Sequence, residues 1–265
     1  MPVGSAISSE REPAKLAAAA AREHGGQAVT VIAPAFNEAE SVAETVESLL
    51  SQPLPTTEII VVDHCSDDDT GPIAASLGVT VVRPPANTGS KAGAQTFALD
   101  HVKTGLVMAV DADTSLAPDG LEKLLAAMDD PGIAAASGFV LPRRVHTLWE
   151  RGRYVEYLFA FSFFKQIQDY YEKPLISSGC FSVYRTEALR ALGGWSTRTL
   201  AEDMDLTWSF YQQGWRVRFV PEAVCYPLEQ NVHLHWCDIL QLGYLRSVVA
   251  VAPTSRNTYS PSRRC

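Results

Sequence analysis

Residues 106–113 read Leu-Val-Met-Ala-Val-Asp-Ala-Asp, so that the apolar run Leu106–Val110 ends in two aspartates one residue apart. A short continuous apolar run is typical of a strand buried on both faces. In open α/β sheets, ligands bind at the edge formed by the carboxyl ends of the strands. Two carboxylates at i and i+2 in a turn can hold one hard cation, which then takes up phosphate oxygens. Asp111 and Asp113 are therefore candidate metal ligands, although acidic strand ends are also typical of ordinary turns and helix caps.

The composition indicates a globular protein of the cytoplasm. The 265 residues suffice for one large domain, and 46% hydrophobic and 20% charged residues are ordinary values. A net charge of −8 argues against a nucleic-acid partner, which would require a basic surface. The cysteines are scattered without a Cys-x-x-Cys pair, which favours free thiols in a reducing compartment. We expect no membrane-spanning helix and no signal peptide, because neither pattern occurs.

Apolar runs alternate with segments of helical periodicity from residue 28 onwards. The predicted strands are 29–33, 58–63, 79–82, 106–110, 133–140, 181–184 and 215–220, and the predicted helices are 39–51, 71–77, 92–101, 118–128, 186–192 and 202–213. This order indicates an α/β fold whose mostly parallel sheet has helices on both faces. We assign this domain to 28–228, with a partly helical appendage at 1–27 and a C-terminal segment ending in a disordered tail at 229–265.

The segment from Thr147 to Tyr171 is dense in aromatic residues. Apolar side chains all round a segment are typical of a helix buried in its own domain, and this is the favoured interpretation. With Arg151, Arg153 and Lys165, the same segment could instead lie on a membrane surface.

Four further segments carry polar side chains at places where such a sheet would bind a ligand. They are Pro34-Ala35-Phe36-Asn37-Glu38, the loop Asp63–Thr70, the loop Asn87–Gly93, and Leu200–Leu206 with Glu202, Asp203 and Asp205. Each has an ordinary alternative, because Asn and Asp cap helices and acidic residues suit the first turn of a helix. Lys91 at a helix start would suit an anion, and a carboxylate in a cleft can act as a general base.

Taken together, the order and spacing of these segments resemble the family-two glycosyltransferases of the GT-A fold. The similarity is strongest to the branch of cellulose, chitin, hyaluronan and poly-N-acetylglucosamine synthases. The matching residues are Pro34-Ala35-Phe36-Asn37-Glu38, Val61-Val62-Asp63 with Ser66, Asp68 and Thr70, Asn87-x-Gly89-x-Lys91-Ala92, Asp111-Ala112-Asp113, Ser178-Gly179-Cys180-Phe181 ending at Arg185, Gly193-Gly194-Trp195, and Glu202-Asp203-x-Asp205-Leu206. The resemblance covers about Val29 to Tyr226, most of the chain.

The resemblance implies a metal-dependent, inverting transfer of a sugar from a UDP-sugar donor to an acceptor hydroxyl, with N-acetylglucosamine as the leading candidate. It implies that the donor is contacted by Pro34, Ala35, Asn37, Glu38 and Asp63, with Lys91 near its base or phosphates. The diphosphate would carry Mg²⁺ or Mn²⁺ held by Asp111 and Asp113, and substrate would also be contacted by Gly179, Trp195 and Asp205. The catalytic base would be Asp203, with Glu202 beside it. The physical logic agrees, because a diphosphate leaves well only when its charge is compensated.

Two departures from the family pattern stand out. The acidic loop usually carries a second aspartate, and here that residue is His64. An imidazole cannot replace a carboxylate that accepts hydrogen bonds from uracil or ribose. The Gln-x-x-Arg-Trp helix of processive members is also absent, and its nearest remnant is His233-Leu234-His235-Trp236. The stretch Ile239–Ala252 is too short to span a bilayer. We therefore expect short-chain or single transfer rather than long polymers.

The alternative is a truncated or degenerate relative that binds a nucleotide-sugar or a glycan without turnover. A dinucleotide-dependent oxidoreductase is disfavoured, since no Gly-x-Gly-x-x-Gly follows the first strand. The expected partners are a UDP-sugar donor and a glycan, lipid-linked or protein acceptor, with no nucleic acid. Peripheral contact with the inner face of the membrane, or a membrane partner, is also considered.

Overall fold

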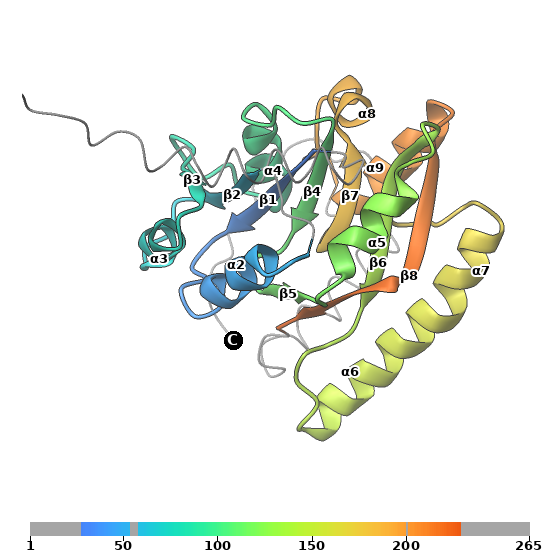
Figure 1. Ribbon diagram of the computed structural model, residues 1–265, viewed down its shortest axis with the longest axis horizontal. Helices are drawn as coiled ribbons and strands as arrows, with labels where there is room; N and C mark the ends of the chain where they lie inside the picture. Colours follow the sequence, from blue (N-terminus) through green and yellow to red (C-terminus); the bar gives the residue numbers. More distant parts are fainter. Residues whose placement is uncertain (1–27, 54–57, 200, 229–265) are drawn as a thin grey trace, which may run out of the picture.

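The computed structural model, drawn in Figure 1, describes residues 28–53, 58–199 and 201–228. The predicted appendage at 1–27 and the predicted C-terminal segment at 229–265, with its His233–Trp236 remnant, lie outside the described residues. Within the described ranges, no helix combines the length and the hydropathy needed to cross a bilayer.

The apolar run before Asp111 forms β4 (Leu106–Val110), and all of its residues are buried. Alternate residues enter two different hydrophobic cores. Met108 packs into the core on one face of the sheet, and Val107 packs into the core on the other face. A strand covered on both faces needs no polar alternation, so the continuous apolar pattern is explained.

The described chain forms an eight-stranded sheet in the order β3-β2-β1-β4-β7-β6-β8-β5. The other strands are β1 Val29–Ala35, β2 Glu58–Asp63, β3 Thr80–Val82, β5 Thr114–Leu116, β6 Ile133–Val140, β7 Phe181–Arg185 and β8 Arg216–Pro227. β1 to β4 run parallel, so the carboxyl ends of β1, β2 and β4 meet at one edge. β7 is antiparallel to both β4 and β6, and β5 is antiparallel to β8. The predicted α/β class is confirmed, and the sheet is more mixed than the alternation alone suggested.

Helices cover both faces of the sheet (Figure 1). Their bounds are α2 Val42–Leu50, α3 Thr70–Ser76, α4 Lys91–Leu99, α5 Gly120–Ala127, α6 Leu148–Phe159, η1 Ala160–Phe164, α7 Lys165–Tyr170, α8 Thr186–Ala191 and α9 Glu202–Gln212. α2, α3 and α5 contribute buried side chains to one core, and α4, α8 and α9 contribute to the other. The two faces therefore have separate apolar cores that share the sheet.

β8 is longer than the sequence predicted. The predicted strand 215–220 ended before Pro221, which cannot donate a backbone hydrogen bond within a sheet. In the structure β8 continues to Pro227, because its register against β6 shifts between Gly138 and Phe139. The shift absorbs Pro221 and brings the second half of β8 alongside β5.

The aromatic segment forms α6, η1 and α7, which Figure 1 shows as one long rod at the edge of the molecule. Its inner face packs on the domain through Phe161, whose ring contacts those of Phe139 and Phe219. The outer face is exposed, with Phe159 57% and Tyr170 82% accessible. The segment packs on its own domain, as favoured, but it is not buried, because only one side of the rod meets the sheet. The single-turn π-helix η1 lies at the point of contact.

Candidate active site

A cavity of about 570 Å³ opens at the carboxyl edge of β1, β2 and β4. It is lined by residues that follow these strands and by the loop before α4: Pro34, Ala35, Phe36, Glu38, His64, Asn87, Gly89, Ser90, Lys91, Asp111, Ala112 and Asp113. We call this the first cavity. Six of the predicted site residues meet there because parallel strands place their following loops at one edge.

Negative charge is concentrated at one end of the first cavity. The Lys91 ammonium forms an ion pair with Asp111 and donates a hydrogen bond to Gly179 O at 3.0 Å. Burial opposes the charge on Lys91, yet Asp111 holds the pKa of Lys91 above its usual range. The pKa of Asp113 is raised to about 6 by burial and by the nearby carboxylates of Asp111 and Glu38. One ammonium therefore does not balance the three carboxylates, and a divalent cation would relieve this crowding.

Burial also raises the pKa of Glu38, although Ser41 donates a hydrogen bond to its carboxylate at 2.6 Å. In the described part of the chain, no group of three or more His, Cys, Asp or Glu side chains is arranged to hold a metal ion. A cation at Asp111 and Asp113 would thus take most of its ligands from elsewhere. This donor set suits a hard ion that keeps open positions for phosphate oxygens.

A second cavity, of about 590 Å³, adjoins the first and shares Lys91, Asp111 and Asp113 with it. Its other lining residues come from the end of β6, from α6, η1 and α7, from the loop before β7, from the start of α9, and from the end of β8 and the residue after it. They are Val140, Arg153, Tyr157, Phe161, Lys165, Ile176, Ser178, Gly179, Cys180, Glu202, Asp203, Pro227 and Leu228. Asp113 and Asp203, which lie far apart in sequence, therefore line the same cavity.

Gly179 lies between Lys91 and Asp203 in the wall of the second cavity. A Cβ atom on Gly179 would lie 3.5 Å from Lys91 Nζ and 3.7 Å from Asp203 Cβ. The absence of a side chain at this position thus lets the loop pass between Lys91 and Asp203. The predicted substrate residue Gly179 lies where the two sets of charged residues meet.

Asp203 lies in the first turn of α9, and a buried hydroxyl pair anchors this turn. Thr207 Oγ1 donates to Asp203 O at 2.7 Å and accepts from Ser177 N at 2.9 Å. Ser177 Oγ lies 2.8 Å from Thr207 Oγ1. The start of α9 is therefore tied to the loop 176–180, which precedes β7.

Lys165 lines the second cavity, whereas the sequence considered it only for contact with a membrane surface. Its ammonium donates to Ile176 O at 3.1 Å and to Ser178 Oγ at 2.9 Å, and it lies 4.6 Å from the centre of the Phe161 ring. Burial lowers the pKa of Lys165 to about 8. No local sequence signal places this residue at the cavity, since it comes from the aromatic segment.

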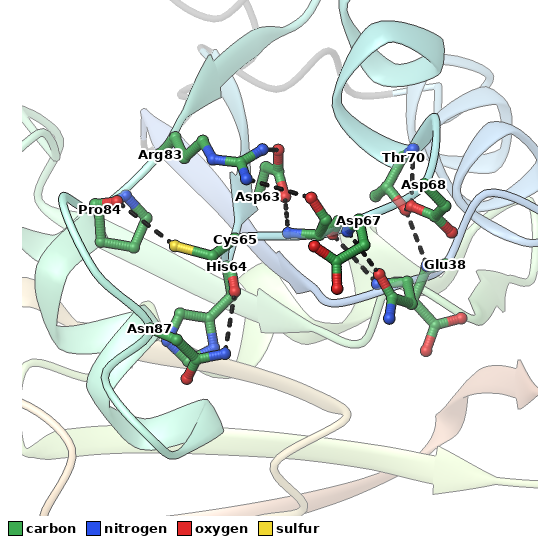
Figure 2. Close-up of polar contacts among 12 residues, drawn as sticks. Glu38, Asp63, His64, Cys65, Asp67, Asp68, Thr70, Arg83, Pro84 and Asn87 are labelled. Atoms are coloured by element: carbon green, nitrogen blue, oxygen red, sulfur yellow. Dashed lines mark hydrogen bonds and ion pairs between the residues drawn. The ribbon is translucent and has the colours of Figure 1, made fainter.

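Asp63 and Asn37 support the edge of the sheet, and Figure 2 shows Asp63 beside Arg83. Asp63 is 3% exposed, and its carboxylate accepts from Ser66 N at 2.9 Å and from Arg83 Nη1 at 2.6 Å. Asn37 adopts a left-handed backbone, with φ of 57°, and its Oδ1 accepts from Asp67 N at 2.9 Å. Neither residue lines the first cavity, and both hold the loops after β1 and β2 together.

Trp195 and Asp205 lie together in a different place. They line a separate cavity of about 630 Å³ beside α4 and α9. Trp195 is 3% exposed and packs edge-to-face on Tyr184, with ring centres 5.6 Å apart. Asp205 accepts two hydrogen bonds from Arg198, at 3.0 and 2.7 Å. The structure therefore does not bring these two predicted substrate residues together with Asp111, Asp113 and Asp203.

The sequence profile described as "Glycosyl transferase family 2" matches residues 30–193, more than half of the chain. The chain belongs to glycosyltransferase family two. It is 25% identical over 207 residues to a poly-β-1,6-N-acetyl-D-glucosamine synthase of Staphylococcus epidermidis, and the match covers 76% of this chain and 50% of the relative. A synthase of the same name from Staphylococcus aureus is 24% identical over 207 residues, with the same coverage. The chain thus spans about half the length of the curated relatives it matches.

Two solved structures share the fold of this family-two chain. The mannosyltransferase PcManGT from Pyrobaculum calidifontis, in complex with GDP-Man and Mn²⁺, superposes with a TM-score of 0.67 at 22% identity, covering 92% of this chain and 73% of that one. The S. aureus TarS fragment 1–349, in complex with UDP-GlcNAc, gives a TM-score of 0.60 at 21% identity, covering 77% of this chain and 59% of that one. At these identities the likeness shows the GT-A fold.

Proposed function

We propose that this chain is a metal-dependent, inverting glycosyltransferase that moves a sugar from a UDP-sugar to an acceptor hydroxyl. N-acetylglucosamine is the leading candidate for the sugar. The observation that carries the proposal is the pair of adjoining cavities, which share Lys91, Asp111 and Asp113 and which end at Asp203. The relatives support the choice of sugar, since they are named as poly-β-1,6-N-acetyl-D-glucosamine synthases.

Asp111 and Asp113 would hold Mg²⁺ or Mn²⁺ at the end shared by the two cavities. When bound, the cation compensates the charge of the leaving diphosphate. Lys91 adds a second positive charge at the same place and is oriented by Gly179 O. Glu38 and Asp113 supply the negative surroundings that favour a cation there.

Asp203 would accept the proton of the acceptor hydroxyl as the hydroxyl oxygen bonds to the anomeric carbon and the bond from that carbon to the diphosphate oxygen breaks. The acceptor would enter through the second cavity, on the side opposite the leaving group, and the configuration would invert. Glu202 lies beside Asp203 on the same cavity wall. The Ser177–Thr207 pair keeps the first turn of α9 in place during this step.

The acceptor is a glycan, a lipid-linked molecule or a protein, and the second cavity suits a sugar because Tyr157 and Phe161 provide aromatic faces. We place the enzyme in the cytoplasm, at the inner face of the membrane. The exposed outer face of α6, η1 and α7 supports this placement. With Tyr171 at the end of α7, its exposed large apolar side chains are Leu148, Val155, Leu158, Phe159, Phe163, Phe164, Ile167, Tyr170 and Tyr171. Sedimentation with anionic vesicles should be lost when Phe163 and Phe164 are replaced by Ser.

The central test is a screen for release of nucleoside diphosphate from a panel of nucleotide-sugars, with and without Mn²⁺. We expect turnover of a UDP-sugar only when Mn²⁺ is present. The Asp113→Asn variant should lose this metal-dependent turnover. Asp100→Asn is the matched control, because Asp100 is an exposed carboxylate at the far end of α4. Binding of UDP without turnover of any donor would support a binding module instead.

A further inference from the structure

His64 is a polar residue of the first cavity that the proposed chemistry does not use. It follows β2, is 6% exposed, and contributes to the wall of the first cavity beside Asn87 and Phe36. The rings of His64 and Phe36 lie 6.5 Å apart in an edge arrangement. Figure 2 shows His64 between the loop after β2 and the loop that carries Asn87.

The hydrogen bonds of His64 decide which ring nitrogen carries the proton. Its Nε2 lies 2.7 Å from Thr88 N and 2.8 Å from Thr88 Oγ1. The hydroxyl can donate or accept, but a backbone N–H can only donate, so the contact with Thr88 N sets the role of Nε2. Nε2 must therefore be the bare acceptor, and the proton lies on Nδ1. Burial lowers the pKa of His64, which favours this neutral form. The imidazole thus offers Nδ1–H as its remaining polar group.

The neighbouring polar groups at this corner already have partners. Asp63 accepts from Ser66 N and from Arg83 with its two carboxylate oxygens, and it does not line the first cavity. Asn87 donates to His64 O at 3.2 Å and accepts from Gly89 N at 2.8 Å. The corner therefore offers a ligand a hydrogen-bond donor, where a carboxylate would offer an acceptor.

The two cavities show which part of a nucleotide would reach this corner. They share only the end with Lys91, Asp111 and Asp113, which suits the diphosphate. The sugar extends from the diphosphate towards Asp203 in the second cavity, so the nucleoside must extend into the first cavity, towards His64 and Phe36. In a pyrimidine nucleotide, the ring position farthest from the ribose is position 4. Uracil carries a carbonyl oxygen there, and cytosine carries an amino group.

We propose that His64 is a specificity-determining residue, whose Nδ1–H donates a hydrogen bond to the 4-carbonyl oxygen of uracil and rejects the 4-amino group of cytosine. This inference rests on the proposed function, because it assigns a base to the nucleotide of the same site. It assigns to His64 the opposite hydrogen-bonding role from that of a carboxylate. The imidazole selects an acceptor on the base, and its other nitrogen holds the loop at Thr88.

The test is isothermal titration calorimetry of UDP and CDP with Mn²⁺ present. The unmodified protein should bind UDP at least about tenfold more tightly than CDP, the ratio that one hydrogen bond supplies. His64→Gln keeps an acceptor at the position of Nε2 for Thr88 and lacks a donor at the position of Nδ1, so the preference should fall to about threefold or less. His64→Asn places its amide at the position of Nδ1 and should keep most of the preference.

A second measurement reports the proton directly. In ¹⁵N-labelled protein, the His64 ring should show a proton on Nδ1 and none on Nε2, and the Nδ1–H signal should shift on addition of UDP and not of CDP. His101, which is exposed on the opposite end of α4, should not shift and serves as the internal control. Because this measurement uses the unmodified protein, it tests the role of His64 even when a His64 variant fails to fold.

Equal affinity of the unmodified protein for UDP and CDP would overturn the inference, and so would a full preference in a folded His64→Gln variant. Both results leave the proposed transfer standing as long as UDP binds. Failure of every nucleotide to bind would instead remove the proposed function, and this inference would fall with it.

Discussion

The two halves of the molecule build their parts of the site by different means. In the first half, β1, β2 and β4 are parallel, and Glu38, His64 and Asp111 line one cavity because each follows a strand end. In the second half, the sheet is mixed, and Asp203 lies on a helix that is anchored by the Ser177–Thr207 hydrogen bonds. The fold itself assembles the first cavity, whereas particular side-chain contacts assemble the second. Changes in the two halves should therefore have separable consequences.

The largest expected effect comes from Asp203→Asn. Removal of a general base costs about 10²–10⁴-fold in turnover, and we expect a loss near the middle of that range. The affinity for UDP should stay within about twofold, because a group used only in the proton transfer adds little to ground-state binding. Steady-state kinetics and UDP calorimetry on the same preparation measure the two quantities. A parallel loss of UDP affinity would contradict the separation of the two halves.

Gly138→Ala tests the packing of the second half. A Cβ atom on Gly138 would lie 2.2 Å from a ring carbon of Phe181 and 2.6 Å from Ala223 O, both closer than any real contact. Forcing extra volume into a packed core costs about 1–3 kcal/mol, and we expect the upper end here, because one of the two obstacles is backbone. Urea denaturation measures the loss.

Gly152→Ala is the matched control for Gly138→Ala. Gly152 lies within α6, and nothing lies within 4 Å of the position a Cβ atom would take. Alanine in a helix is more favourable than glycine by about 1 kcal/mol, so this variant should be equally stable or more stable than the unmodified protein. A similar loss in both variants would show that the close approach of Phe181 to Gly138 is not what limits stability.

Thr207→Val tests whether the hydroxyl pair holds the base in place. The substitution preserves shape and leaves Ser177 N without its acceptor, and we expect kcat to fall about tenfold with little change in KM for the donor, the cost of one buried hydrogen bond. Thr207→Ser restores the hydroxyl and should recover most of the lost turnover. If Thr207→Ser does not recover turnover, or if Thr207→Val affects only KM, then the Ser177–Thr207 pair has a purely structural role.

The sequence predicted the first half of the site better than the second, for a physical reason. A buried strand followed by acidic residues announces both the strand and the edge at which Asp111 and Asp113 lie. The strand pattern does not reveal which way an end residue faces, and Asp63, which is predicted to contact the donor, accepts a hydrogen bond from Arg83 in the structure. In the second half, Lys165 reaches the cavity through the packing of one helix against the sheet, which no local motif records.

The differences in strand length and in helix burial also arise from contacts that no local pattern records. β5 has three residues and β8 passes through Pro221, so neither strand has a complete local pattern, and pairing between them completes both. The exposed outer face of α6, η1 and α7 also carries large apolar side chains, among them Phe159, Phe163 and Phe164. Periodicity therefore could not distinguish the side that packs against Phe219 from the side that does not.

The smallest expected effect is a pH dependence that involves His64. Burial lowers the pKa of His64 from its usual 6.5, so the unfolded chain binds more protons than the folded chain as the pH falls below 6.5. The stability that the neutral imidazole contributes is fully present above pH 6.5, and it is lost as the pH falls through the lower pKa of the folded state. Protonation of Nε2 would also turn the acceptor of Thr88 N–H into a second donor.

Urea midpoints at pH 7.5 and pH 5 isolate this contribution when the unmodified protein is compared with His64→Gln. The carboxylates that titrate in the same range are common to both proteins, so their contribution cancels in the difference. We expect a smaller decline in His64→Gln, whose amide does not titrate, and weaker UDP binding at pH 5 in the unmodified protein alone. If the urea midpoint falls equally in the two proteins, the stability of the loop at Thr88 does not depend on the protonation of His64. The contact between His64 and Thr88 would then not be a feature that sets the first half of the site apart.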